Sequence, residues 1–404
     1  MSEPHAAVEA AARDAYGKLV AWGARFARDV VAAEDALADA LERALRTWPE
    51  RGVPNNPEAW LLTTARNRMR DGEKHDGVRR RAEATLTQLY EELGGVDTVL
   101  DQRLELMLVC AHPAIDEAAR APLMLQVVLG LDATAVARAF MVSPAGMSKR
   151  LVRAKAKIKA AAIGFERPEP EVWPKRLGAV LDAIYAAYGR AWDLGCPVDA
   201  GVEALRAEAL HLGRVVATAT PSEPEALALR ALMLYCEARA SARTDSMGSF
   251  VPLDEQEVAR WDAACVREAE ALLRAASAHA SVGRYQLEAA IQSAHVARLQ
   301  EGVDNREEVR ALYRLLHQHH PSMGAWLGLC AASARLDGPE AALQVLRAAD
   351  AAAFFAHQPY WALRFELAQQ AGAADEAVDC LNRAIALTAH PAVQRWLRQR
   401  RTEA

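Results

Sequence analysis

With 404 residues, the chain exceeds what one hydrophobic core usually holds, so two or three domains are expected. Hydrophobic residues make up 52% of it and aromatic residues only 6%, a balance rich in alanine and leucine that favours helices over strands. The formal net charge of -5 excludes a nucleic-acid role based on overall charge, so such a role would need a local basic patch.

The first predicted element is an amphipathic helix in FARDVVAAEDALADALERAL. Its apolar positions recur at helical spacing and comprise Phe26, Val30, Ala33, Leu37, Leu41 and Ala44. Acids occupy other faces: Asp29, Glu34, Asp35, Asp39 and Glu42. The helix therefore carries an acidic surface, which is either a protein-binding surface or an ordinary solvated face.

A loop is predicted next, because RTWPERGVPNNPEAW contains three prolines and two adjacent asparagines. Asn56 precedes Pro57 and is expected to cap a second helix, NPEAWLLTTARNRMRD, which ends in cations at Arg66, Arg68 and Arg70. The polar, glycine-marked residues 83–100 are expected to form a linker. Residues 1–82 thus form a first helical domain.

Residues 101–165 are predicted to form a second helical domain that ends in a helix-turn-helix. DATAVARAF and SPAGMSKRLVRAKAKIKAAA are separated by only MVS, the usual length of that turn. Ser143 is expected to cap the last helix, with a buried stripe of Met147, Leu151, Ala154 and Ile158. Its other faces carry polar and cationic residues suited to duplex DNA or, alternatively, simply to solvent: Ser148, Lys149, Arg150, Arg153, Lys155, Lys157 and Lys159.

FERPEPEVWP, residues 165–174, is rich in proline and glutamate and is expected to be the main domain boundary. Amphipathic helices continue over residues 175–404, and a period of 35 superposes Trp326 on Trp361. The same period pairs Ala342 with Ala377, Leu346 with Leu381 and Ala349 with Ala384. This pattern favours a tetratricopeptide-like repeat, although chance alignment in an alanine- and leucine-rich chain is an alternative.

Other sites are not expected. The six scattered cysteines form no C-x-x-C pair, and neither a signal peptide nor an apolar run of 18 residues is present, so we expect reduced thiols in a cytoplasmic protein without membrane contact. The histidines of HQHH, residues 317–320, lack the cysteine partners of a tetrahedral metal site. Without a phosphate loop or a nucleophile motif, no catalytic residue, cofactor or metal is predicted.

In combination, these segments resemble a sigma factor of the extracytoplasmic-function (ECF) type, in the subgroup with a tetratricopeptide-like extension. AAEDALADALERALRTWP and NPEAWLLTTARNRMRD resemble sigma region 2, and LVCAHPAID with APLMLQVVLGLDATAVARAFMVSPAGMSKRLVRAKAKI resembles region 4. ARASARTD, LDEQEVARWD and GRYQLEAAIQSAH resemble the extension. The resemblance implies an all-α fold and a non-catalytic protein that binds bacterial core RNA polymerase and promoter DNA.

Site residues follow from the resemblance. The acidic residues Asp29, Glu34, Asp35, Asp39 and Glu42 would contact the polymerase. The minus-10 element would be bound by Asn55, Asn56, Trp60, Arg66, Arg68 and Arg70, although Trp60 would equally suit a core and the asparagines a turn with a helix cap. The minus-35 element would be read by Ser148, Lys149, Arg150, Arg153, Lys155 and Lys157.

The extension would regulate or support activity through a protein partner or an intramolecular contact. Two alternatives stay open. The chain is either a helix-turn-helix regulator that uses only the second domain, or an interaction scaffold whose sigma-like half has degenerated. RDGEKHDG, residues 70–77, favours the scaffold because it is more acidic than the usual end of region 2.

Overall fold

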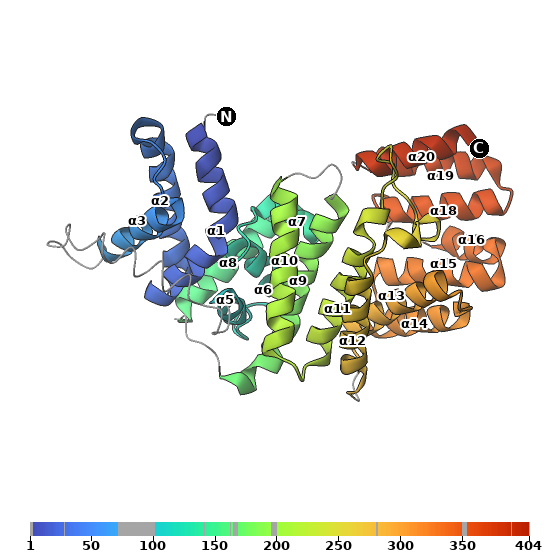
Figure 1. Ribbon diagram of the computed structural model, residues 1–404, viewed down its shortest axis with the longest axis horizontal. Helices are drawn as coiled ribbons and strands as arrows, with labels where there is room; N and C mark the ends of the chain where they lie inside the picture. Colours follow the sequence, from blue (N-terminus) through green and yellow to red (C-terminus); the bar gives the residue numbers. More distant parts are fainter. Residues whose placement is uncertain are drawn as a thin grey trace. The chain divides into compact units, whose positions relative to one another are not determined.

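The computed structural model describes residues 3–27, 29–71, 102–140, 142–161, 163–164, 169–194, 200–279, 282–349, 354–388 and 390–403. These residues are almost entirely helical, and a single bridge between Thr244 and Phe250 is their one extended pairing (Figure 1). The predicted all-α fold is confirmed. The expected linker at 83–100 and most of RDGEKHDG lie outside the described residues.

The chain divides into two compact units. The first holds the helices up to α10 (Ala200–Ala219), and the second holds those from α11 (Pro224–Ala238) to the C-terminal helix α20 (Pro391–Glu403). The proline-rich segment expected to be the main boundary follows α8 (Pro144–Ala160). It ends in a 3-10 turn, Pro170–Val172, which leads directly into α9 (Trp173–Leu194). The first unit therefore continues past this segment and includes α9 and α10 (Ala200–Ala219).

Three N-terminal helices pack together in the first unit: α1 (Glu3–Ala27), α2 (Val30–Arg51) and α3 (Pro57–Asp71). The predicted acidic helix begins later than expected, because the Asp29 carboxylate accepts hydrogen bonds from the Val31 and Ala32 N–H groups and so caps α2. Phe26 consequently belongs to α1, where the residue is 43% exposed and its ring stacks on Trp22. It is not part of the apolar stripe of α2.

Helix α2 also ends later than expected from the predicted proline-rich loop. It includes Pro49 and stops at Gly52, whose φ of 84° favours glycine and whose N–H donates to the Trp48 carbonyl oxygen. The true loop between α2 and α3 is short and spans residues 52–56. It leaves Asn55 exposed and Asn56 half-buried.

Four further helices complete the expected second domain: α5 (Gln102–Cys110), α6 (Glu117–Val127), α7 (Ala133–Ala139) and α8 (Pro144–Ala160). Their ends are set by local caps, since Asp116 accepts from the Ala118 N–H and Asp132 from the Ala135 N–H. Leu106, Met107 and Leu123 are among the fully buried residues of this group.

Arginine side chains connect α9 and α10 to α5 and α7. Arg176 donates to the Leu108 carbonyl oxygen at 2.9 Å, and Arg190 donates to the Ala135 carbonyl oxygen at 3.4 Å. The guanidinium of Arg103 on α5, with only 6% of its side chain exposed, forms an ion pair with Glu208 on α10. These contacts explain why the first two helices after the proline-rich segment belong to the first unit.

The second unit begins with three consecutive helices, α11 (Pro224–Ala238), α12 (Ala263–Ser277) and α13 (Arg284–Glu301). The start of α13 is capped by a side chain from α11: the Glu225 carboxylate accepts from the Tyr285 and Gln286 N–H groups. A negative charge at a helix N-terminus also interacts favourably with the helix dipole. This contact fixes the GRYQLEAAIQSAH stretch against α11.

The remaining helices follow in pairs. They are α14 (Arg306–His319), α15 (Met323–Asp337), α16 (Pro339–Ala348), α18 (Gln358–Gln370), α19 (Ala374–Leu387) and α20 (Pro391–Glu403). The 35-residue period coincides with the pairs α15/α16 and α18/α19. Ala342 and Ala377 are both buried, as are Leu346 and Leu381, so equivalent positions serve the same packing role.

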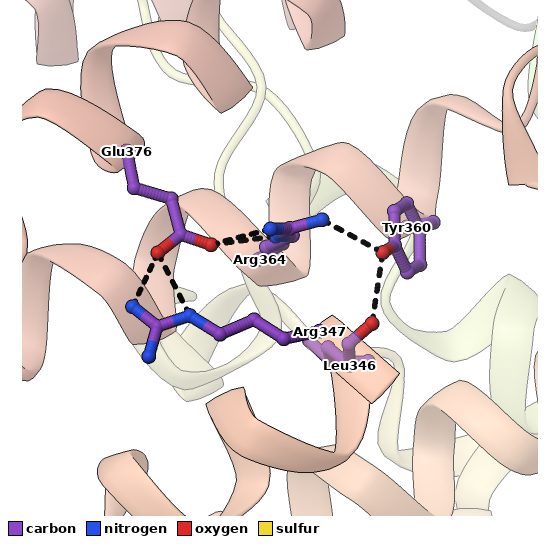
Figure 2. Close-up of polar contacts among 5 residues, drawn as sticks. All are labelled: Leu346, Arg347, Tyr360, Arg364 and Glu376. Carbon is purple, nitrogen blue, oxygen red and sulfur yellow. Dashed lines mark hydrogen bonds and ion pairs between the residues drawn. The ribbon is translucent and has the colours of Figure 1, made fainter. Parts of the chain in front are cut away.

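A polar network joins α16, α18 and α19 beside this core (Figure 2). Glu376 accepts from Arg347 and from Arg364, whose Nε lies 2.7 Å from the carboxylate. The fully buried Tyr360 donates its hydroxyl hydrogen to the Leu346 carbonyl oxygen at 3.0 Å and accepts from Arg364. Because each polar group in Figure 2 has a partner, the network joins three helices without leaving a charge buried alone.

Candidate nucleic-acid interface

Helix α8 has the predicted cap and the predicted buried stripe. The Ser143 hydroxyl accepts from the Gly146 N–H at 3.2 Å, and Pro144 begins the helix. Met147, Leu151, Ala154 and Ile158 are all buried against the neighbouring helices. This packing fixes which faces of α8 reach solvent, and both expectations are confirmed.

The polar residues predicted to read DNA divide into two groups. Ser148, Lys149, Arg153 and Lys157 are exposed on α8. Arg150 instead donates to the Ala118 carbonyl oxygen of α6 at 3.1 Å, and Lys155 forms an ion pair with Glu34 of α2 at 3.0 Å. The exposed group is free to approach phosphates and base edges, whereas the other two are engaged within the unit.

The acidic residues of α2 divide in the same way. Asp35, Asp39 and Glu42 are exposed, while Glu34 is 8% exposed and Asp29 caps the helix. Glu42 lies 3.9 Å from Arg46, one turn further along. Asp35, Asp39 and Glu42 thus share one outward face of α2.

The residues predicted to bind the minus-10 element lie on the α2–α3 loop and on α3. Local contacts hold most of them. Asn56 accepts from the Ala59 N–H at 3.0 Å and so caps α3, as its position before proline predicted. Trp60 packs edge-on against the buried ring of Trp48, with ring centroids 5.6 Å apart. Both residues thus have a structural role, and Asn55 is the exposed polar residue of the loop.

The arginines of α3 contact the other N-terminal helices. Arg66 lies over the ring of Phe26, 5.3 Å from its centroid, and Arg68 donates to Asp39 at 2.6 Å. That second contact links a residue predicted to bind DNA with one predicted to bind the polymerase, although both side chains are at least half exposed. Arg70 lies in the last turn of α3, and its side chain is outside the described residues.

A buried polar junction surrounds Glu34. Burial raises the pKa of its carboxyl although Lys155 acts in the opposite direction, and its Oε2 has no hydrogen-bond partner among the described residues. Burial, with the Glu34 charge, also raises the pKa of the Tyr16 hydroxyl and of the Cys110 thiol. The four groups come from α1, α2, α5 and α8, so the junction joins the acidic helix to the basic one.

Close backbone packing accompanies this junction. A Cβ added at Gly17 on α1 would overlap the carbonyl oxygen of Val128, just beyond α6. Gly130, whose φ of 66° favours glycine, lies against the ring of Tyr16. Glycine at both positions lets α1 approach the end of α6 within van der Waals distance.

Sequence reasoning placed Glu34 and Lys155 on outward faces and missed their pairing. The signal was nevertheless present in the spacing. Glu34 follows Val30 by four residues and precedes Leu37 by three, and Lys155 stands in the same relation to Leu151 and Ile158. Each therefore borders its helix's apolar stripe, where a charged residue needs a partner.

Comparison with known proteins supports the N-terminal part of this description. Residues 12–82 match the Sigma-70 region 2 family, and residues 176–277 match a family of unknown function (DUF6596). An uncharacterized protein of Rhizobium meliloti (strain 1021) is 33% identical over 387 residues, which cover 93% of this chain and 90% of that protein. No solved structure matches the chain.

The Sigma-70 region 2 match supports a sigma-factor role in RNA polymerase binding and promoter recognition. The chain belongs to the same family as the Rhizobium protein. The DUF6596 match begins in α9 and ends in α12, so it includes helices of both compact units.

Over the described ranges, no group of three or more histidine, cysteine, aspartate or glutamate side chains is placed to hold a metal ion. Within those same ranges, no helix has the length and apolar character needed to cross a membrane. Cys110, Cys236, Cys265, Cys330 and Cys380 are free thiols.

Proposed function

We propose that the protein is an ECF-type sigma factor that binds bacterial core RNA polymerase, recognises promoters and starts transcription. The Sigma-70 region 2 match at residues 12–82 carries this proposal. The outward acids of α2 and the outward cations of α8 support it, because a sigma factor needs one surface for the polymerase and another for DNA. The protein itself would carry out no catalysis and need no cofactor.

The domain roles are part of the proposal. Residues 1–82 act as region 2, residues 83–100 as linker, and residues 101–165 as region 4 with α7 and α8 as its helix-turn-helix. Residues 175–404 form a tetratricopeptide-like extension that regulates or supports activity. The paired helices α15/α16 and α18/α19, with equivalent alanines and leucines buried, support the repeat.

The exposed residues define the contacts. Asp35, Asp39 and Glu42 would meet the polymerase, Asn55 would bind an unpaired base of the minus-10 element, and α8 would bind the minus-35 element through Ser148, Lys149, Arg153 and Lys157. Lys155 and Glu34 are better suited to hold the two helix groups together, because each neutralises the other.

In vitro transcription with bacterial core RNA polymerase on a genomic fragment library tests the proposal. Transcripts that share upstream elements are expected, and they should be lost when Asp35 and Asp39 are replaced by alanine. Duplex binding with no transcript from any fragment would favour the helix-turn-helix regulator. Folded protein without polymerase binding would favour the degenerate scaffold.

Two substitutions separate promoter binding from promoter opening. Arg153→Ala should weaken duplex binding, and Asn55→Ala should impair opening while leaving binding intact. Lys175→Ala is a matched control, because Lys175 is an exposed cation of the same unit on α9. Equal losses in both steps from both variants would contradict this division of roles.

The effect of the extension is measured with a fragment that ends at residue 219. Such a fragment keeps α9 and α10, which contact α5 and α7 through Arg103, Arg176 and Arg190. More transcript from the fragment than from the full chain would mean that the rest of the extension inhibits. Less transcript would mean that it supports activity.

A further inference from the structure

A long non-helical segment lies between α11 and α12 of the second unit. Residues 243–261, here called the strap, contain the Thr244–Phe250 bridge and two 3-10 turns, Leu253–Glu255 and Val258–Arg260, but no helix longer than three residues. Figure 1 shows this yellow segment reaching from the end of α11 to α20. Loops of this length without regular structure are uncommon in compact domains and are usually functional.

Two consecutive acids of the strap contact three helices that are far apart in the sequence. Asp254 forms ion pairs with Arg298 of α13 and Arg335 of α15. Glu255 forms one with Arg400 of α20 at 2.5 Å. The strap therefore contacts α13, α15 and α20, three non-consecutive helices of the second unit.

Further contacts hold the preceding residues of the strap to α20. The Phe250 N–H donates to the Ala392 carbonyl oxygen at 3.2 Å, and the Phe250 ring packs edge-on against Trp396. The Gly248 carbonyl oxygen accepts from Arg395. We call the four arginines that face the strap the strap face: Arg298, Arg335, Arg395 and Arg400.

The strap face is cationic. Two titratable groups lie beside its four arginines. Glu366 of α18 is half-buried, and burial raises the pKa of its carboxyl. His295 of α13 is neutral, because burial lowers its pKa to about 4. One carboxyl against four guanidinium groups leaves an excess of positive charge. An acidic chain is the chemistry that complements it.

The acidic contacts of the strap are replaceable. The side chains of Asp254 and Glu255 are 41% and 52% exposed, and ion pairs at such exposure contribute only about 0–1 kcal/mol each. The strap is anchored elsewhere, by the buried side chains of Ser249, Gln256 and Trp261. Releasing the two acids would therefore leave the anchors in place.

We propose that the strap face is a docking site for an extended acidic segment of a protein partner. In the free chain the strap's own acidic pair, Asp254 and Glu255, occupies that site, and a partner segment with two adjacent carboxylates replaces these two acids while the strap stays anchored. Planar guanidinium groups held on three helices recognise carboxylates spaced along an extended chain. This inference does not depend on the role in transcription.

Fluorescence anisotropy on the full-length protein tests it, with a labelled peptide of residues 249–258, SFVPLDEQEV, as probe. A tethered segment competes at a high effective concentration, so the wild type should bind the peptide weakly. Asp254→Ala/Glu255→Ala frees the strap face and should bind it at least about tenfold more tightly. Adding Arg335→Ala or Arg400→Ala to that variant should abolish binding.

Arg306→Ala in the same background is the matched control, because Arg306 pairs with Asp304 and should leave binding unchanged. A peptide with asparagine and glutamine in place of its acids should not bind. Circular dichroism checks that each variant is folded, and Asp254→Asn/Glu255→Gln replaces the alanine variant if that one unfolds. Failure of the folded variant to bind the peptide, or binding that survives loss of Arg335 and Arg400, would overturn the proposal.

Discussion

Lys155→Ala tests the junction between the acidic and basic helices. The Lys155 ammonium lies 3.0 Å from the Glu34 carboxylate, and the two side chains are 27% and 9% exposed. At an effective dielectric constant of about 20, opposite unit charges at that separation attract by about 5–6 kcal/mol, most of which offsets the cost of taking them out of water. Removing the lysine leaves the carboxylate buried without its partner.

The net loss of unfolding free energy at pH 7.5 should be about 1–3 kcal/mol. Breaking a fully buried pair costs about 3–5 kcal/mol, but Lys155 is partly exposed and Glu34 can take up a proton instead. Urea unfolding of the full-length variant and the wild type measures the difference. Lys157→Ala, an exposed cation on the same helix, is the control and should change stability by less than about 0.5 kcal/mol.

The loss should depend on pH with a defined sign. The pKa of Glu34 is raised in the folded protein above its ordinary value of 4.5, so the folded state binds more protons than the unfolded state. Its contribution to stability is thus complete below pH 4.5 and is lost as pH rises through the folded pKa. Removing Lys155 raises that pKa further, so the difference between variant and wild type should be large at pH 7.5 and small at pH 4.5.

An equal loss at both pH values would refute this explanation. A double variant provides a second check, because Glu34→Gln removes the charge that Lys155 neutralises. Combined with Lys155→Ala, it should recover most of the stability lost at pH 7.5. A double variant no more stable than Lys155→Ala alone would show that packing, and not charge, determines the loss.

Gly17→Ala should destabilise the first unit, because its new methyl group overlaps the Val128 carbonyl. Gly189→Ala on α9 meets nothing within 4 Å and should stabilise the folded state by up to about 1 kcal/mol. Thermal melting of the two variants and the wild type measures both effects. Leu381→Ala should cost about 2–4 kcal/mol in urea unfolding, because its side chain is 1% exposed, while Val378→Ala on the same helix, 45% exposed, should cost far less. Tyr360→Phe should cost about 1–2 kcal/mol, since a buried carbonyl loses its donor, and an unchanged midpoint would contradict the network in Figure 2.

The sequence alone determined the local structure correctly at several points. Ser143 before Pro144 and Asn56 before Pro57 predicted two helix caps, and both are present. The spacing of Met147, Leu151 and Ile158 predicted which side of α8 is buried. Such features follow from the sequence because a cap or a helical stripe depends only on residues within a few positions of one another.

Placement of the candidate site residues was harder to predict. Exposed residues such as Asp35 and Arg153 lie where helical periodicity put them, and Asn55 lies in the predicted loop. Glu34 and Lys155, in contrast, are 121 residues apart, and only the packing of α2 against α8 shows that each neutralises the other. Helical periodicity identifies the face of a residue but not the helix that faces it.

Length, composition and helical spacing by themselves determined that the protein is all-α, with an acidic helix near the start and a basic one at 144–160. Only the tertiary structure decided that α9 and α10 belong to the first unit and that the strap lies against α13, α15 and α20. Helix formation depends on nearby residues, whereas these contacts depend on ion pairs between residues tens to more than a hundred positions apart.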